Sequence, residues 1–307
     1  MSSTVQSLLC EAETRIPRFE AELLLAHTLK KNRSFVIAHP EYSTTQEERY
    51  QFDAFVTRRT EHEPVAFLVG RKEFYGREFL VNEHTLIPRP ETELLVEKIL
   101  EHISNIENGS QAPRLENRSI VIIDIGTGSG NIITTIATEL SSRENHEKHF
   151  SFIGTDISKD ALDIAKKNSE KLSVSDKIRF IQSDLLENIP KEFSSRAQES
   201  IIAANLPYLS TEEFSNAPID VKHFEPRSAL ESGTDGFDHY RRLLEELRKN
   251  FQRQKRNSKT TLFFEISPSQ KSQISSLIQA IFPRANSEIF RDLAQKYRLV
   301  KISIDRI

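Results

Sequence analysis

The first sixty residues carry apolar side chains at the spacing of an α-helix. In the run RFEAELLLAHTLK, five positions recur at i, i+3, i+4, i+7 and i+8 and so share one helical face; they are Ala21, Leu24, Leu25, Thr28 and Leu29. Thr45 and Glu48 have the spacing of a helix-capping box, and Phe52 and Val56 continue the apolar side of the helix that follows. The pattern predicts a small helical bundle over residues 1–62. No catalytic set of side chains occurs in it, so we interpret it as a docking or packing domain.

The pattern changes over residues 63–88. Two runs of β-prone residues, Ala66–Val69 and Glu78–Val81, flank Gly70 and Gly76. Short β-prone runs separated by glycine are typical of a β-hairpin. We therefore expect a hairpin that links the helical bundle to the rest of the chain.

Two prolines, Pro88 and Pro90, separate this hairpin from a new helix that is expected over about residues 91–101. A polar run that contains glycine and proline follows at 104–118 and predicts a surface loop. We place the domain boundary near Pro88, so that a second, larger domain covers residues 89–307.

Strands and helices alternate from residue 119 onward. The run SIVIIDIG is almost entirely apolar, which is typical of a parallel strand buried on both faces. Seven strands are predicted, the last two as a closing pair: 119–126, 149–156, 177–182, 200–205, 261–266, 287–292 and 297–304. This alternation predicts an α/β fold, a doubly wound and Rossmann-like sheet with a ligand at the carboxyl ends of its strands.

Composition excludes several classes of protein. The 42 Lys and Arg residues against 45 Asp and Glu residues give a net charge of −3, which argues against stable nucleic-acid binding. We interpret the basic run 248–259 as a solvated helix end and loop in preference to an RNA contact. A single cysteine, Cys10, excludes an internal disulfide and a Cys-rich zinc module, and we expect no metal. No apolar run reaches the roughly 18 residues of a membrane span, and no signal peptide is recognisable, so we expect a cytoplasmic protein.

Glycine is scarce and unevenly placed. The chain has 9 glycines in 307 residues, and three of them fall in the run DIGTGSGN between a predicted strand and a predicted helix. The dinucleotide-binding fingerprint needs a glycine where this chain has Asn131, and the Walker phosphate loop needs a lysine that is absent here. The form D-x-G-x-G-x-G is that of S-adenosylmethionine-dependent methyltransferases. We expect five loop residues to bind the cofactor: Gly126, Thr127, Gly128, Ser129 and Gly130.

Two acidic residues follow the next two strands. Asp156 ends the second predicted strand, where a carboxylate can accept hydrogen bonds from both hydroxyls of a ribose. Asp184 follows the third strand and is placed to accept from the adenine amino group, with Leu185 packing near the ring. All three residues are therefore candidates for cofactor binding.

The run Asn205-Leu206-Pro207-Tyr208 comes directly after the fourth predicted strand. A conjugated amino group is a poor nucleophile, and hydrogen bonds from it to the Asn205 side-chain oxygen and the Leu206 carbonyl would orient it and stabilise its developing positive charge. Tyr208 offers a flat wall for a planar amide or base, and Pro207 stiffens the turn. The run contains neither His nor Cys, so we expect no general base and a shallow pH–rate profile near neutrality.

With these residues in view, the chain resembles the HemK-type peptide chain release factor glutamine N5-methyltransferases over almost its whole length. The resemblance rests on these segments: EPVAFLVG, EFYGREFLVNEHTLIPRPETELLVEKIL, DIGTGSGNI, GTDIS, SDLL, FEPRSALESGTDGFDHYRRLL and RDLAQKYRLV. Several of them lie in linkers that generic methyltransferases lack.

The resemblance implies a seven-stranded methyltransferase sheet, S-adenosyl-L-methionine as cofactor, and a helical N-terminal domain that docks the substrate. It implies methyl transfer to the side-chain amide nitrogen of the glutamine in the Gly-Gly-Gln motif of peptide chain release factors. Residues 205–208 would hold that glutamine, and Asn205 would also touch the cofactor. Arg89, Pro90 and Glu91 match the family segment that borders the substrate pocket.

The chain departs from the family at Leu206, where the family usually has proline. The carbonyl of this position survives, whereas a φ constraint is lost and one backbone N–H is gained. Asn-Leu-Pro-Tyr also resembles the motif of ribosomal RNA adenine dimethyltransferases, but those enzymes begin close to their glycine loop. The segment EISPSQ (residues 265–270) lacks the glycine that often follows the fifth strand.

Three hypotheses follow. The first is methylation of release factor glutamine by a monomeric enzyme. The second is methylation of another target, either a ribosomal protein glutamine or an RNA adenine N6. The basic run 248–259 is the observation that favours the RNA target. The third is a binding module that keeps the methyltransferase fold without its activity. Leu206, in place of the usual proline, is the observation that favours it. Cofactor titration separates the third from the others, and ribonuclease treatment of the substrate separates RNA from protein.

Overall fold

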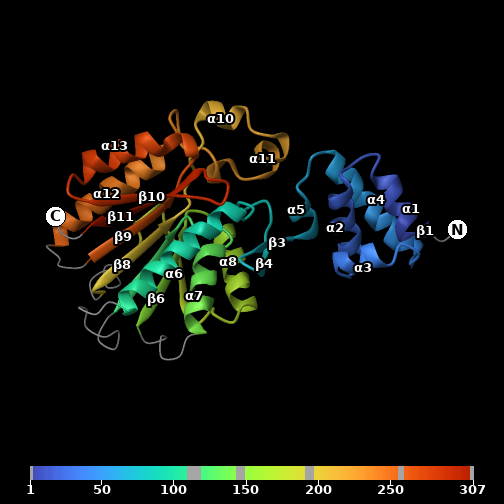
Figure 1. Ribbon diagram of the computed structural model, residues 1–307, viewed down its shortest axis with the longest axis horizontal. Helices are drawn as coiled ribbons and strands as arrows, with labels where there is room; N and C mark the ends of the chain where they lie inside the picture. The colour runs from blue at the N-terminus through green and yellow to red at the C-terminus, as the bar shows by residue number, and fades with distance from the viewer. Residues whose placement is uncertain (1–2, 109–118, 143–148, 191–196, 255–258, 305–307) are drawn as a thin grey trace.

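The computed structural model describes residues 3–108, 119–142, 149–190, 197–254 and 259–304 (Figure 1). The N-terminal part is a helical bundle, as predicted; its helices are α1 (Val5–Ala12), α2 (Arg18–Thr28), α3 (Arg33–Ala38), α4 (Gln46–Thr60) and α5 (Val65–Val69). A short antiparallel pair, β1 (Ser3–Thr4) with β2 (Ser43–Thr44), joins the segment before α1 to the segment before α4. The predicted face of α2 is buried, and the capping box of Thr45 and Glu48 is formed at the start of α4.

The predicted hairpin exists, but its first strand was placed too early. The strands are β3 (Arg71–Phe74) and β4 (Arg77–Leu80), whereas Ala66–Val69, predicted as a strand, lies in helix α5. Pro64 precedes this helix, and its Leu68 side chain packs into the apolar core of the N-terminal bundle. Burial against that core therefore outweighs the local β propensity of the run.

The hairpin contacts the larger domain through two phenylalanines. Phe74 and Phe79 are fully buried and belong to the same apolar cluster as helix α6 (Glu93–Asn108) and strand β5 (Ile120–Ile125). Their rings meet edge to face with centroids 6.0 Å apart. The hairpin is thus packed on the larger domain as well as being a connection. The domain limits 1–62, 63–88 and 89–307 stay a prediction.

Helix α6 is longer than predicted. It follows a 3-10 turn, η1 (Pro90–Thr92), and continues to Asn108, so residues 104–108 are helical where a loop was expected. Ile103 is fully buried and Ile106 packs on the same cluster, which continues the apolar face of the helix beyond residue 101. Residues 109–118 of the predicted loop lie outside the described residues.

A seven-stranded sheet forms the larger domain in the order β10-β11-β9-β8-β5-β6-β7. Besides β5, its strands are β6 (Phe150–Asp156), β7 (Ile178–Gln182), β8 (Glu199–Ala204), β9 (Lys259–Glu265), β10 (Asn286–Arg291) and β11 (Tyr297–Ile304). Five strands run parallel, and β11 pairs antiparallel with both β9 and β10. The doubly wound seven-stranded fold predicted from the sequence is confirmed.

Helices cover both faces of the sheet (Figure 1). One face carries α6, α7 (Asn131–Ser141) and α8 (Lys159–Lys171), and the other carries α12 (Asp238–Gln254) and α13 (Lys271–Ile281). Alternate residues of β5 enter the two cores: Ile122 faces the cluster that includes α6 and α7, while Ile123 faces the cluster that includes α12 and α13. Burial on both faces explains the continuous apolar run of this strand.

Shorter elements lie between β8 and α12: α10 (Thr211–Ser215), α11 (Ile219–Phe224) and η3 (Arg227–Ala229). A further 3-10 turn, η4 (Pro268–Gln270), precedes α13. Of the basic run 248–259, residues 248–254 form the end of α12 and 255–258 lie outside the described residues. No helix in the described part of the chain combines the length and the apolar character that crossing a bilayer requires.

Candidate functional site

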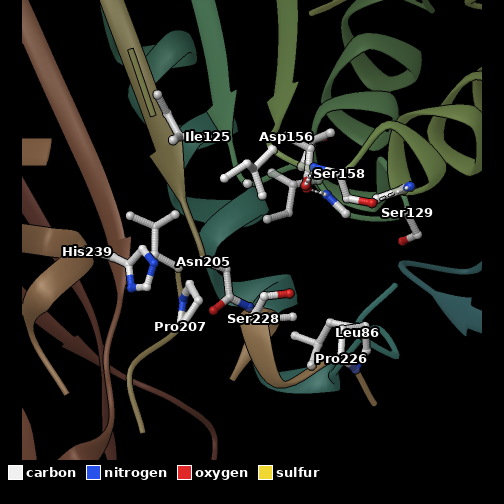
Figure 2. Close-up of a pocket in the computed structure, with 18 of the residues that line it drawn as sticks. Leu86, Ile125, Ser129, Asp156, Ser158, Asn205, Pro207, Pro226, Ser228 and His239 are labelled. Atoms are coloured by element: carbon white, nitrogen blue, oxygen red, sulfur yellow. Dashed lines mark hydrogen bonds between the residues drawn. The ribbon is translucent and has the colours of Figure 1, made fainter. Parts of the chain in front are cut away.

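A cavity of about 160 Å³ opens at the carboxyl ends of the parallel strands. Segments far apart in the sequence line it, among them the loop after β5, the ends of β6 and β8, and the segment before α6 (Figure 2). This is the edge of the sheet at which an α/β fold binds its ligand. Eleven sequence-predicted site residues line the cavity: Arg89, Gly126, Thr127, Gly128, Ser129, Asp156, Asp184, Leu185, Asn205, Leu206 and Pro207.

The glycine loop turns the chain from β5 into α7. Gly128 and Gly130 have φ angles of +55° and +77°, in the left-handed region that side chains disfavour. A Cβ atom on Gly130 would lie 3.0 Å from the Ala165 Cβ atom of helix α8, and the Gly130 N–H donates to the Thr127 carbonyl over 2.8 Å. The loop therefore packs tightly against α8 at Gly130. At Gly128, by contrast, an added Cβ meets no atom within 4 Å.

A buried aspartate stabilises the glycine loop through a hydrogen bond to Thr127. Asp124 is completely buried in β5, and its carboxylate accepts a 2.6 Å hydrogen bond from the Thr127 hydroxyl. Its second oxygen has no hydrogen-bond partner among the described residues. Burial raises the pKa of Asp124 to about 7, against a smaller lowering by the Thr127 hydrogen bond. Asp124 is the aspartate of the D-x-G-x-G-x-G form, but the sequence did not predict that it supports Thr127.

Asp156 joins two segments of the site. One carboxylate oxygen accepts from the Gly128 N–H and the other from the Ser158 N–H, each over 2.9 Å. Burial raises the pKa of this acid. A carboxylate offers about four lone-pair positions, so these two bonds leave capacity for further donors from the cavity. Ser158 also caps helix α8, where its side chain accepts from the Ala161 N–H.

On the far side of the cavity, Asp184 pairs with Arg242 of helix α12, with 2.8 Å between Oδ2 and Nη2. Leu185 is buried beside it, with a φ angle of +48°. His239 lies one turn before Arg242, and its Nδ1 atom is 2.8 Å from the Ser232 hydroxyl. Both His239 and Arg242 line the cavity and were missed from the sequence. Their only signal was their place in the family-like segment FDHYRRLL.

The Asn205 motif is held at three points. The Asn205 side-chain amide donates to the Thr92 hydroxyl over 3.1 Å, and the Leu206 N–H donates to the Tyr240 hydroxyl over 3.3 Å. The carbonyl of Tyr208 accepts from the side-chain amide of Gln270 over 2.9 Å. Burial raises the pKa of the Tyr208 phenol. Gln270 lies in the segment that lacks the family glycine, and it supports the motif from there.

Asn205 stands between two cavities. Leu206 and Pro207 line the first cavity, whereas Tyr208 lines a second one of about 170 Å³. Asn205 and Arg89 line both. Figure 2 shows Asn205 and Pro207 beside each other at the end of β8. A side chain at the junction of two cavities can contact two bound molecules at once.

The segment before α6 reaches the site through a partly buried ion pair. Arg89 pairs with Glu225, whose side chain is 1% exposed and which also accepts a 3.0 Å hydrogen bond from the Ile87 N–H. Three residues were predicted here. Arg89 lines both cavities, whereas Pro90 and Glu91 are exposed and are not among the described residues that line either cavity. Pro88 and Thr92, on either side, line the first cavity instead. Thr92 was missed although it stands next to the predicted residues.

Two protein families match the chain: the PrmC N-terminal domain over residues 3–70 and a methyltransferase domain over residues 116–230. A release factor glutamine methyltransferase of Bacillus anthracis is 33% identical, with 92% of each chain covered. That of Bacillus subtilis (strain 168) is 36% identical over 91% of this chain and 89% of its own. The chain belongs to the release factor glutamine methyltransferase family. This confirms the resemblance found in the sequence.

The chain is also similar to a longer methyltransferase and to a solved structure. A bifunctional methyltransferase of Rickettsia bellii is 34% identical over 94% of this chain, which spans 51% of that protein. Among solved structures, the hMettl16 catalytic domain in complex with the MAT2A 3'UTR hairpin 1 is superimposable with a TM-score of 0.50, at 11% identity, covering 80% of this chain and 79% of that one. That likeness supports the fold alone. As a member of the release factor glutamine methyltransferase family, the chain keeps the methyltransferase sheet and adds the N-terminal bundle.

Proposed function

We propose that this chain transfers a methyl group from S-adenosyl-L-methionine to the side-chain amide nitrogen of the glutamine in the Gly-Gly-Gln motif of a peptide chain release factor. The single observation that carries the proposal is the position of Asn205. Its side chain lies between the cavity of the glycine loop and the second cavity beside Tyr208. One cavity is suited to the cofactor and the other to the glutamine.

The residues of the first cavity fit S-adenosylmethionine. The loop around Gly128 offers open space beside the backbone, and Asp156 keeps unused lone pairs for ribose hydroxyls. Thr127, Ser129 and Gly130 complete the loop that would hold the methionine and ribose portions. Asp184 and Leu185 would border the adenine, with Arg242 fixing the position of the Asp184 carboxylate. When bound, this cofactor supplies an electrophilic methyl group.

The second cavity suits the planar amide of a glutamine side chain. Leu86, Tyr208 and Leu230 give it apolar walls, and Arg89 stands at its boundary with the first cavity. We propose that Asn205 Oδ1 and the Leu206 carbonyl accept hydrogen bonds from the glutamine NH₂ group. These bonds would withdraw the nitrogen lone pair from conjugation and stabilise the positive charge that develops on nitrogen. Pro207 at the end of β8, and Pro90 and Glu91, which follow Arg89 in the chain, would shape the approach to this pocket.

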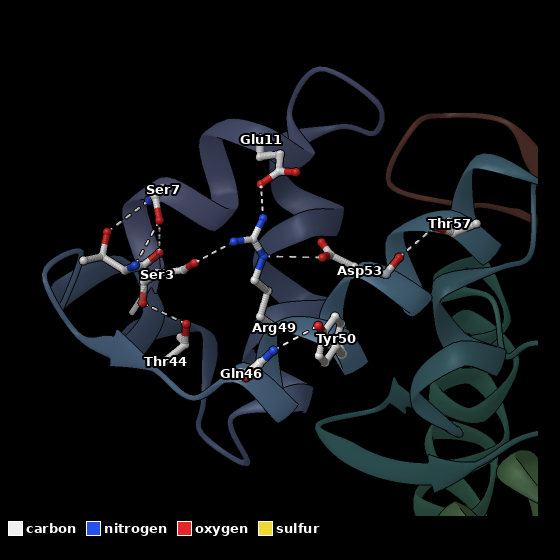
Figure 3. Close-up of polar contacts among 10 residues, drawn as sticks. Ser3, Ser7, Glu11, Thr44, Gln46, Arg49, Tyr50, Asp53 and Thr57 are labelled. Atoms are coloured by element: carbon white, nitrogen blue, oxygen red, sulfur yellow. Dashed lines mark hydrogen bonds and ion pairs between the residues drawn. The ribbon is translucent and has the colours of Figure 1, made fainter. Parts of the chain in front are cut away.

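The N-terminal bundle is proposed to dock the release factor. Arg49 of helix α4 holds one end of the bundle together: it donates to the Ser3 hydroxyl over 3.2 Å and pairs with Glu11 of helix α1 and with Asp53 of its own helix (Figure 3). Phe19 and Ile37 are 55% and 51% exposed on helices α2 and α3. Apolar side chains presented by a well-braced bundle can bind another protein at low entropic cost.

We further propose that the enzyme acts as a monomer in the cytoplasm and binds no nucleic acid stably. The net charge of −3 supports the last point, because stable binding to phosphate backbones draws on an excess of Lys and Arg. Both cavities and the bundle belong to one chain, so methyl transfer does not require a second copy.

The deciding experiment is to incubate the purified protein with a release factor and isotope-labelled S-adenosylmethionine, then to locate the label by mass spectrometry of peptides. We expect one labelled methyl group on the glutamine of the Gly-Gly-Gln peptide. A release factor with alanine in place of that glutamine is the control and should remain unlabelled. Label on RNA that ribonuclease removes, or on a ribosomal protein alone, would contradict the proposal.

A further inference from the structure

The imidazole ring of His239 is held in place by a buried serine. The hydroxyl oxygen of Ser232 lies 2.8 Å from His239 Nδ1 and accepts the backbone N–H of His239 over 3.1 Å. Ser232 is 1% exposed, and its own N–H donates to the carbonyl of Leu209 over 2.8 Å. Leu209 directly follows the Asn205 motif in the chain. The ring of His239 is therefore fixed relative to the end of that motif.

These contacts decide which nitrogen of the ring carries the hydrogen. A hydroxyl group has one hydrogen and two lone pairs. One lone pair of the Ser232 hydroxyl takes the backbone N–H of His239, and its hydrogen has His239 Nδ1 as its acceptor within the described part of the chain. A hydrogen on Nδ1 would leave the buried hydroxyl hydrogen without an acceptor, which is unfavourable in a protein interior. The neutral ring therefore carries its hydrogen on Nε2.

The ring is uncharged near neutral pH. Burial lowers the pKa of His239, and the nearby Arg242 guanidinium lowers it further. The carboxylates of Asp184 and Asp238 raise the pKa of His239 by less, so its net direction is downward. Nδ1 is engaged by Ser232, which leaves Nε2–H as a neutral hydrogen-bond donor for a ligand.

His239 belongs to the part of the first cavity that borders the proposed adenine position. It lies three residues before Arg242 on helix α12, so the two side chains share one face of that helix. Arg242 pairs with Asp184 over 2.8 Å, and all three residues line the first cavity. Figure 2 shows His239 on the opposite side of the view from Ser129 of the glycine loop. His239 is thus placed away from the loop proposed to hold the methionine portion of the cofactor.

We propose that His239 is a cofactor-binding residue whose Nε2–H donates a hydrogen bond to an unprotonated ring nitrogen of the adenine of S-adenosylmethionine. Adenine has an amino group that donates hydrogen bonds, and its ring nitrogens N1, N3 and N7 accept them. The Asp184 carboxylate can only accept, so it suits the amino group, whereas His239 supplies the donor that a ring nitrogen needs. This inference rests on the proposed function, because it takes the first cavity to be the cofactor site.

Calorimetry with S-adenosylhomocysteine tests this bond on the purified protein. His239→Phe keeps a planar ring and removes the donor, whereas His239→Gln keeps an N–H donor. We expect His239→Phe to weaken binding about 3- to 10-fold, the scale of one hydrogen bond between neutral groups, and His239→Gln to recover most of this loss. His39→Phe, at an exposed histidine of the N-terminal bundle, is the matched control and should bind as the wild type does. Equal affinities of the wild type and His239→Phe would overturn the proposal.

Three analogues of S-adenosylhomocysteine identify the acceptor, each with a C–H group in place of N1, N3 or N7 of adenine. We expect one of them to bind the wild type about 3- to 10-fold more weakly than S-adenosylhomocysteine does. With that analogue, His239→Phe should cause no further loss, because the bond is already absent. If His239→Phe weakens the binding of all three analogues as much as that of S-adenosylhomocysteine, no ring nitrogen accepts from His239 and the proposal is wrong.

A further measurement uses the free protein. The imidazole signals of His239 in ¹H–¹⁵N NMR spectra, recorded above neutral pH and assigned through His239→Gln, should show the hydrogen on Nε2 in the wild type. Ser232→Ala removes the hydroxyl and should give a mixture of the two neutral forms. A hydrogen on Nδ1 in the wild type would overturn the proposal. If S-adenosylhomocysteine binds with the expected pattern but release factor is not methylated, the proposed function fails and this inference stands; absence of any binding would refute both.

Discussion

The backbone N–H of Leu206 donates a hydrogen bond to the hydroxyl of Tyr240, with 3.3 Å between nitrogen and oxygen. The family usually has proline at this position, which has no N–H to donate. Tyr240 is completely buried, so the N–H gained with leucine has a partner in place of an unpaired site. The fold thereby accommodates leucine in place of the family proline. Leu206 is then no longer a reason to favour an inactive binding module.

Tyr240→Phe should destabilise the protein because it leaves the Leu206 N–H unpaired in the core. We expect a loss of about 1–3 kcal/mol in the free energy of unfolding, the usual cost of a buried unsatisfied group, measured by urea denaturation. In a Leu206→Pro background the same change should cost less, because proline has no N–H to strand. Costs that simply add in the double variant would show that the Leu206 N–H is not the group that Tyr240 satisfies.

Asn205→Ala should abolish methyl transfer and spare cofactor binding. Loss of one group that stabilises a developing charge costs about 10²- to 10³-fold in kcat, and the glycine loop and Asp156 are untouched by this change. Release factor methylation and the affinity for S-adenosylhomocysteine would be measured side by side. Asn216→Ala, at an exposed asparagine after helix α10, is the matched control and should behave as wild type. An Asn205→Ala variant with wild-type kcat would refute the role given to this residue.

Gly130→Ala should be more harmful than Gly128→Ala. Both glycines have positive φ, which costs an alanine roughly 1–2 kcal/mol. At Gly130 the new Cβ atom also lies 3.0 Å from Ala165 Cβ and 3.1 Å from its Cα, whereas at Gly128 it meets nothing within 4 Å. We expect Gly130→Ala to lose about 1 kcal/mol or more of additional stability through overpacking. Urea denaturation of the two variants checks the difference, and equal losses would contradict this packing.

Glu265→Gln should become more stable relative to wild type as the pH rises. The pKa of Glu265 is about 7 in the folded protein and near 4.5 in the unfolded chain, because burial disfavours the charge. Between these values the folded state binds more protons than the unfolded state, so its free energy of unfolding falls as the pH increases. The loss from this group amounts to roughly 3 kcal/mol at most.

Glutamine does not titrate, so the stability difference between Glu265→Gln and wild type should grow from pH 4.5 to about pH 7 and then level off. Unfolding by urea at four pH values between 5 and 8 measures it. Glu245→Gln is the control, because it makes the same change at an exposed glutamate of helix α12, and it should show no such trend. A difference that stays constant with pH would mean that Glu265 is already ionised at acid pH.

Much of the fold was predictable because its signals are local. A continuous apolar run such as Ile120–Ile125 reports burial on both faces, and the Thr45–Glu48 box marks a helix start through bonds within four residues. Three glycines between a strand and a helix imply a tight turn against a ligand, and Asn205 follows a buried strand at the correct edge of the sheet. Each of these inferences needs only neighbouring residues, so the sequence by itself determined them.

Tertiary structure decided what depends on distant partners. Ala66–Val69 has the composition of a strand and becomes a helix because Leu68 packs on the N-terminal core. The group around Asn205 draws Thr92, Tyr240 and Glu265 from positions separated by up to 173 residues in the chain, brought together where β8 and β9 end side by side. No periodicity or spacing connects such residues. Their contacts, their burial and the raised pKa of Glu265 arise only when the sheet order places those strand ends at one edge.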